Sequence, residues 1–180
     1  MTSASLFGFS FFASLAFLAV QTSAAYTWTM SRRKLNLATL DDAVAEARRL
    51  HERGYDRAGT WNLAQVCDHL TRLMTKSRDG FGDARFGWPM RLFGRLAKPL
   101  LVRMTSMPAG VEGPPSFMPP ADLSDERAAI EAMERAVRRV QESGATFHPS
   151  PLLGTLTQAQ WINIHRVHAA HHLGFLVPRG

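Results

Sequence analysis

The chain has 180 residues, of which 46% are hydrophobic and 20% are charged, and its formal net charge at pH 7 is +6. This length and composition fit one globular domain and exclude a disordered chain, a collagen-like repeat and, with a single cysteine, a disulfide scaffold. The basic residues are scattered and no nucleic-acid-binding motif is evident, so we expect a solvated basic surface and no nucleic-acid partner.

The first 29 residues contain no charged side chain and include an apolar run at 6–20. We expect 1–29 to be a hydrophobic N-terminal segment, separate from a domain at 30–180. Small residues follow the run, as in a secretory signal, but no basic residue precedes it. Three interpretations stay open: a cleaved signal, a membrane anchor through residues 6–25, or an extension upstream of a true start near Met30. The last predicts a cytoplasmic protein, the others an exported or anchored one, and a membrane partner is expected only if the segment is retained as an anchor.

Apolar residues in the body recur at helical spacing, and nowhere do they alternate long enough to predict a sheet. The predicted helices, with their capping residues, cover 39–54, 61–76, 89–104, 124–144 and 157–176. Pro99 is expected to kink or split the third helix. The stretch 105–122 holds five prolines and predicts a long connection that crosses the length of a bundle. We therefore predict an all-α four-helix bundle with one long crossover connection and an extra helix.

Four of the seven histidines lie in the last predicted helix. At about 100° per residue, His165, His168 and His172 share an arc of about 60°, whereas His171 points to one side. His168 and His172 are four residues apart, so one helix can present both to a single divalent ion. Trp161 shares this arc and, like Trp88, is expected in the core.

A third ligand must come from another helix, and the candidate is His69 on the apolar side of the predicted helix 61–76. A lone histidine on such a face is more often a core residue bonded to a backbone carbonyl. Because another helix presents a chelating pair, we favour His69 as a metal ligand over a purely structural role. We interpret His51 as an exposed residue, His148 as a loop residue and Cys67 as a small buried residue.

The motifs WxLxxVxxHL at 61–70 and HAAHHLG at 168–174 resemble the DinB/YfiT-like superfamily of metal-binding four-helix bundles. The run from 148 to 176 is similar to a branch of it known only as a domain of unknown function. The resemblance covers about residues 33–176 and implies an up-down-down-up bundle. It also implies a divalent metal, zinc or nickel, held by His69, His168 and His172. A glutamine that often follows the second motif in this superfamily is replaced here by Phe175 or Leu176, so its role is not carried over.

Three histidine ligands leave a coordination position open, as in catalytic zinc sites. The resemblance implies a thiol-dependent S-transferase or a metal-assisted hydrolase that acts on a small molecule, with a low-molecular-weight thiol as co-substrate. The alternative is a non-catalytic, metal-stabilised bundle that serves as a binding or interaction module. Gln65 and His165 are candidates for supporting roles next to the ligands, and no catalytic or further cofactor-binding residue is assigned. The superfamily makes a homodimer plausible.

Overall fold

The computed structural model describes residues 32–82, 86–107 and 115–179, and the expectations for 1–29 lie outside them. This part of the chain forms five α-helices and a two-stranded sheet, so the prediction of a mostly helical fold is confirmed. The elements are α2 (Asp41–Arg53), β1 (Tyr55–Arg57), α3 (Leu63–Asp79), α4 (Trp88–Leu101), the 3-10 helix η1 (Pro115–Phe117), α5 (Glu126–Gln141), α6 (Gln158–Leu173) and β2 (Leu176–Pro178).

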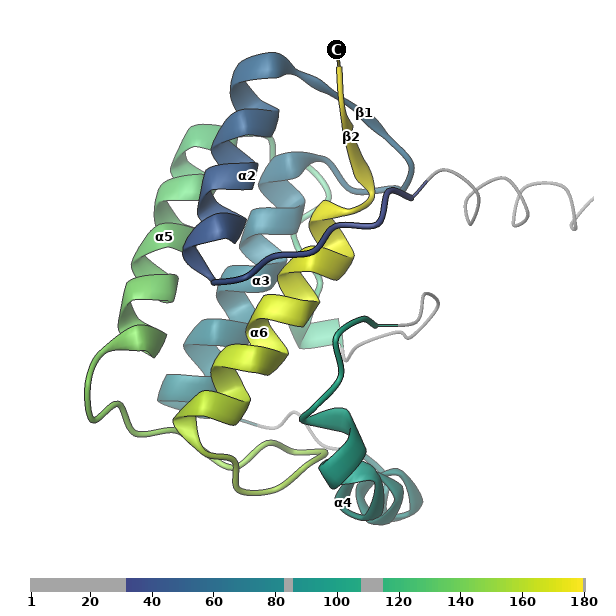
Figure 1. Cartoon of the computed structure of the whole chain (residues 1–180), viewed down its shortest axis with the longest axis vertical. Coiled ribbons are helices and arrows are strands. Elements are labelled where there is room, and N and C mark those ends of the chain that lie inside the picture. Colours follow the sequence, from purple (N-terminus) through teal and green to yellow (C-terminus); the bar gives the residue numbers. More distant parts are fainter. Residues whose placement is uncertain (1–31, 83–85, 108–114, 180) are drawn as a thin grey trace, which may run out of the picture. The chain divides into compact units, whose positions relative to one another are not determined.

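Helices α2, α3, α5 and α6 lie side by side and form the body of the fold (Figure 1). Helices α3 and α5 run parallel. At their starts, the side chain of Asn62 donates a hydrogen bond to the Leu123 carbonyl, and at their ends Arg139 pairs with Asp79. Helices α2 and α6 run in the opposite direction to this pair (Figure 1).

Side chains at the helix starts explain where α3 and α6 begin. The predicted capping box of α6 is present: Thr157 Oγ1 accepts a hydrogen bond from the Gln160 N–H, and Gln160 Oε1 accepts one from the Thr157 N–H. Asn62 and Gln65 form the same arrangement at α3. Each box satisfies two backbone donors that the helix itself leaves unpaired.

Apolar side chains of the four bundle helices form one continuous core. Leu50, Leu70, Met133 and Leu173 are fully buried in it. A smaller cluster lies beneath the loops and contains Trp161, which is only 2% exposed, as predicted. The helices that carry the candidate ligands are therefore fixed by buried apolar side chains on both sides of the histidines.

The sheet was not predicted, because strands of three residues are too short to show an alternating pattern. Strand β1 pairs antiparallel with β2 and ties the end of the chain to the loop after α2. The last helix consequently ends at Leu173, three residues before its predicted end at 176. Beside the sheet, the Arg33 N–H donates a hydrogen bond to the Gly174 carbonyl.

Helix α4 stands apart from the four bundle helices (Figure 1). It continues through Pro99 to Leu101, so the predicted split does not occur. Its buried residue is Gly94, where an added Cβ would lie only 2.6 Å from the carbonyl oxygen of Leu152. The prediction that Trp88 lies in the core is wrong, because α4 turns its opposite side to the body and leaves this indole 74% exposed.

Candidate metal centre

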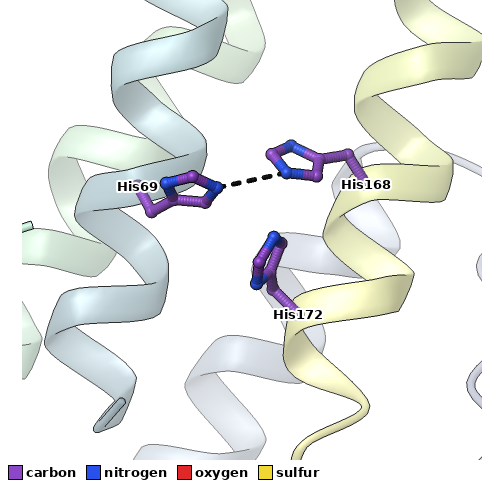
Figure 2. Close-up of side chains that lie close together, drawn as sticks. All are labelled: His69, His168 and His172. Atoms are coloured by element: carbon purple, nitrogen blue, oxygen red, sulfur yellow. Dashed lines mark hydrogen bonds between the residues drawn. The ribbon is translucent and has the colours of Figure 1, made fainter. Parts of the chain in front are cut away.

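Three imidazoles from two helices converge at one point inside the bundle. Figure 2 shows His69 on one helix facing His168 and His172 on the other. The Nε2 atoms of His69 and His168 are 3.2 Å apart, and one nitrogen from each of the three rings lies within 4.8 Å of the others. Two nitrogen ligands of a tetrahedral zinc ion, each about 2.0–2.1 Å from the metal, would be about 3.3–3.4 Å apart. The three predicted residues are thus brought together at a spacing that can hold a metal ion.

A backbone carbonyl fixes the orientation of His69. Its Nδ1 lies 2.8 Å from the carbonyl oxygen of Phe117, and a carbonyl can only accept a hydrogen bond. The ring proton of neutral His69 is therefore on Nδ1, and the lone pair of Nε2 points toward His168 (Figure 2). Metal-binding histidines in proteins are commonly oriented in this way by a bond from the other ring nitrogen.

Gln65 holds the loop that supplies this carbonyl. Its Nε2 donates hydrogen bonds to the carbonyls of Pro120 and Ala121, each at 3.0 Å. Its Oε1 belongs to the capping box of α3 with Asn62. Gln65 thus acts on the loop after η1 rather than directly on the imidazoles.

Burial keeps the clustered imidazoles neutral. Desolvation is the largest cause that lowers the pKa of each ring, and charges on the neighbouring histidines add to it for His168 and His172. The pKa of His172 falls to about 2, that of His168 lies well below its usual value, and that of His69 is lowered. Because neutral imidazole is the form that binds metal, protons do not compete strongly for these nitrogens at pH 7.

His165 shares their face of α6 but lies deeper in the protein and outside the three-histidine cluster. It stacks on Trp161 with 5.3 Å between the ring centroids, and its Nε2 lies 3.1 Å from Ser77 Oγ. The Ser77 hydroxyl donates to the Met74 carbonyl, so Nε2–H of His165 donates to the hydroxyl oxygen. Burial lowers the pKa of His165 to about 3, so this ring is neutral and is bonded into the core.

Replacing Ser77 with alanine is expected to lower the free energy of unfolding by about 1–3 kcal/mol, because the buried Nε2–H of His165 would lose its acceptor. Urea denaturation of the two proteins measures this difference. Ser106→Ala, at an exposed position, is the matched control and should change stability by less than about 0.5 kcal/mol. Equal stability of the Ser77 variant and the native protein would show that His165 does not depend on this hydroxyl.

Of the three clustered histidines, His172 borders a cavity of about 220 Å³. His172 and His171 line the cavity together with Trp61 and Phe175. The Trp61 indole stacks on His172 with 5.3 Å between the ring centroids and so forms a wall of the site. At the edge, Arg32 Nη1 donates a hydrogen bond to His171 Nδ1 over 2.8 Å.

His51, His148 and Cys67 lie where the sequence predicted. His51 is exposed on α2, as predicted, and contacts Glu126. His148 is an exposed loop residue, and its backbone N–H bonds the Ser77 carbonyl. Cys67 is fully buried, and burial raises the pKa of its thiol to about 12, so it is not a nucleophile near neutral pH.

The roles of Phe117 and Trp61 were not predicted from the sequence. Phe117 acts through its backbone carbonyl, so no residue type in the proline-rich stretch could indicate it. Trp61 does begin the first quoted motif, and its position two residues before α3 was the available signal. Both residues shape the site from outside the helices that carry the ligands.

No curated protein and no solved structure matches the chain. A family model described as a protein of unknown function (DUF1569) matches residues 29–179. The expected similarity to a domain of unknown function is thereby confirmed. Because the match covers nearly the whole chain, the protein belongs to the DUF1569 family.

Proposed function

We propose that this protein is a metal-dependent enzyme that acts on a small molecule, as a thiol-dependent S-transferase or a metal-assisted hydrolase. In this proposal His69, His168 and His172 hold a zinc or nickel ion. The observation that carries it is a cluster of three neutral imidazoles, one buried and two half-buried, with one oriented ring and a cavity beside His172. We further propose that the bundle belongs to the DinB/YfiT-like superfamily.

The residues present fit a divalent ion. All three donors are imidazole nitrogens, which suit zinc and nickel, and the lone pair of His69 Nε2 already points into the cluster. Three protein ligands leave at least one coordination position free. When bound with such a position, the ion lowers the pKa of a water or thiol and supplies a nucleophile near neutral pH.

The protein side chains would bind and shield the substrate. Trp61 and Phe175 give the cavity two aromatic walls beside His172. At about 220 Å³ the cavity is smaller than the usual range of roughly 300–1,000 Å³ for ligand pockets, which favours a small substrate. The wall that Trp61 forms against His172 would keep bulk water from that side of the ring.

The helix directions support the superfamily assignment. The resemblance implies an up-down-down-up order, which requires the second and third bundle helices to run parallel. Contacts at both ends of α3 and α5 agree with this requirement. The predicted long crossover corresponds to the connection from α4 to α5. Residues 108–114 of this connection lie outside the described part of the chain.

The test compares the full-length protein after metal removal with the same protein reloaded with zinc or nickel. Each form is mixed with a panel of low-molecular-weight thiols and an electrophilic acceptor, and separately with activated esters. We expect about one bound ion per chain and turnover only in the loaded form. His51→Ala removes a histidine outside the cluster and is the control. It should keep both the bound ion and the turnover.

Two results would contradict the proposal. If elemental analysis finds no bound divalent ion after reloading, the shared site does not exist. If an ion binds and its removal unfolds the protein, but the panel shows no turnover, the non-catalytic metal-stabilised bundle is the better description.

A further inference from the structure

Helix α4 carries most of the exposed large hydrophobic side chains of the described chain. Elsewhere in these residues, Met118 alone belongs to this class, and it is 37% exposed. On α4 the exposed fraction reaches 74% for Trp88 and for Leu96. The other exposed apolar residues of the helix are Met90, Leu92, Phe93 and Leu100. A soluble protein rarely presents so much contiguous apolar surface without a partner.

Five of the six exposed apolar residues of α4 lie on one face, and Met90 lies outside it. At about 100° per residue, Trp88, Leu92, Phe93, Leu96 and Leu100 fall within an arc of about 140°. Gly94 lies opposite the middle of this arc and makes the close approach to Leu152. The helix thus turns its smallest residue toward the protein and its largest residues outward.

Basic side chains flank this apolar face. Arg91, Arg95 and Lys98 occupy an arc of about 60° between Gly94 and Trp88. Lys98 bonds the Thr155 carbonyl, whereas Arg91 and Arg95 are exposed. The sequence from 86 to 107 contains no acidic residue.

The two arginines are available to an external anion. Within residues 32–82, 86–107 and 115–179, no ion pair involves Arg91 or Arg95. Both also line, with His148, a cavity of about 590 Å³. This cavity gives room for an anionic headgroup beside the apolar face.

We infer that α4 is an interfacial helix that docks the protein on the surface of an anionic lipid bilayer. Its apolar arc would lie among the acyl chains at the headgroup boundary, and Arg91 and Arg95 would contact the lipid phosphates. Tryptophan, phenylalanine and leucine on one face with arginine and lysine beside them are typical of such helices. The helix would lie in the membrane plane, since no helix of the described residues is long and apolar enough to cross a bilayer.

Charge favours a bilayer over a second copy of the chain as the occupant. Two antiparallel copies of α4 packed face to face would place the arginines of both on the same side, and this stretch supplies no acidic side chain to compensate them. An anionic bilayer supplies negative charge and an apolar layer at once. The inference rests on α4 alone and depends neither on the metal nor on residues 1–29.

The experiment places a nitroxide label on α4 of the full chain through Leu96→Cys. Cys67 is fully buried, with its thiol pKa raised to about 12, and therefore does not compete for the label. Glu131→Cys, at an exposed position of α5, is the matched control. Vesicles of phosphatidylcholine, with and without phosphatidylglycerol, are then added. With the anionic vesicles, collisions of the label at 96 with oxygen should rise and those with a water-soluble nickel complex should fall, while the label at 131 should not change.

The charge contribution is tested with Arg91→Gln/Arg95→Gln in the full chain. Each basic residue near an anionic surface strengthens binding about fivefold. Removing both arginines should therefore lower the partition into anionic vesicles roughly 25-fold. Unchanged partition would mean that another part of the chain binds the lipid. The inference would also be overturned if the label at 96 stayed in water when anionic vesicles were added. It would likewise be overturned if, without lipid, the label showed spin–spin broadening caused by a second copy of the chain.

Discussion

Replacing His168 with alanine is expected to lower the affinity of the protein for zinc by roughly two to three orders of magnitude. Structural zinc sites with four ligands gain about 10–16 kcal/mol from the metal, so each ligand accounts for about 2.5–4 kcal/mol. The ring of His168 lies 4.9 Å from that of His69 and 4.6 Å from that of His172, and the latter two are 4.5 Å apart, so all three rings are mutual neighbours. Its loss leaves two nitrogens that belong to different helices.

The measurement is a competition titration of the full chain with a chromophoric zinc chelator. His69→Ala and His172→Ala should weaken binding to a similar extent. His51→Ala removes an exposed imidazole and should bind zinc as the native protein does. Native affinity in His69→Ala would show that the histidines of α6 bind metal alone, and the site shared between α3 and α6 would be wrong.

Removing the metal should lower the melting temperature by roughly 8–16 °C. A ligand present at about 1,000 times its Kd stabilises the folded state by about 4 kcal/mol, because it binds that state and not the unfolded one. In a domain of about 150 residues, each kcal/mol corresponds to roughly 2–4 °C. The cluster joins α3 to α6, so the ion would hold two core helices together.

Calorimetry of the zinc-loaded protein with and without a chelator measures this shift. In His168→Ala, which lacks the complete cluster, the chelator should move the melting temperature by much less. If the chelator lowers it equally in both proteins, the stabilising ion is bound somewhere else.

The helices and the histidine cluster could be predicted because their signals are local. The capping box of Thr157 and Gln160 lies within four residues. The spacing of His168 and His172 places both rings on one side of α6, and a third histidine on an apolar helix face was then the natural partner. Such patterns depend on helix geometry and need no knowledge of the tertiary contacts.

The parts that could not be predicted depend on contacts between distant segments. The carbonyl that orients His69 belongs to Phe117, 48 residues further along the chain. Trp88 is a large apolar residue of a kind usually found in cores. It is exposed because α4 packs against the body through the side that carries Gly94. The apolar periodicity of α4 predicts a helix but not which of its faces meets the protein.

The pairing of β1 with β2 also bears on the order in which the fold assembles. Strand β2 follows α6 and is held by residues 55–57, and the Arg179 N–H bonds the Gly54 carbonyl beside it. Helix α6 is therefore anchored at its C-terminal end by a segment about 120 residues earlier in the sequence. Contacts between such distant segments form slowly, because a long loop must close first. We therefore expect His168 and His172 to reach their final positions beside His69 late in folding, after this long-range pairing has formed.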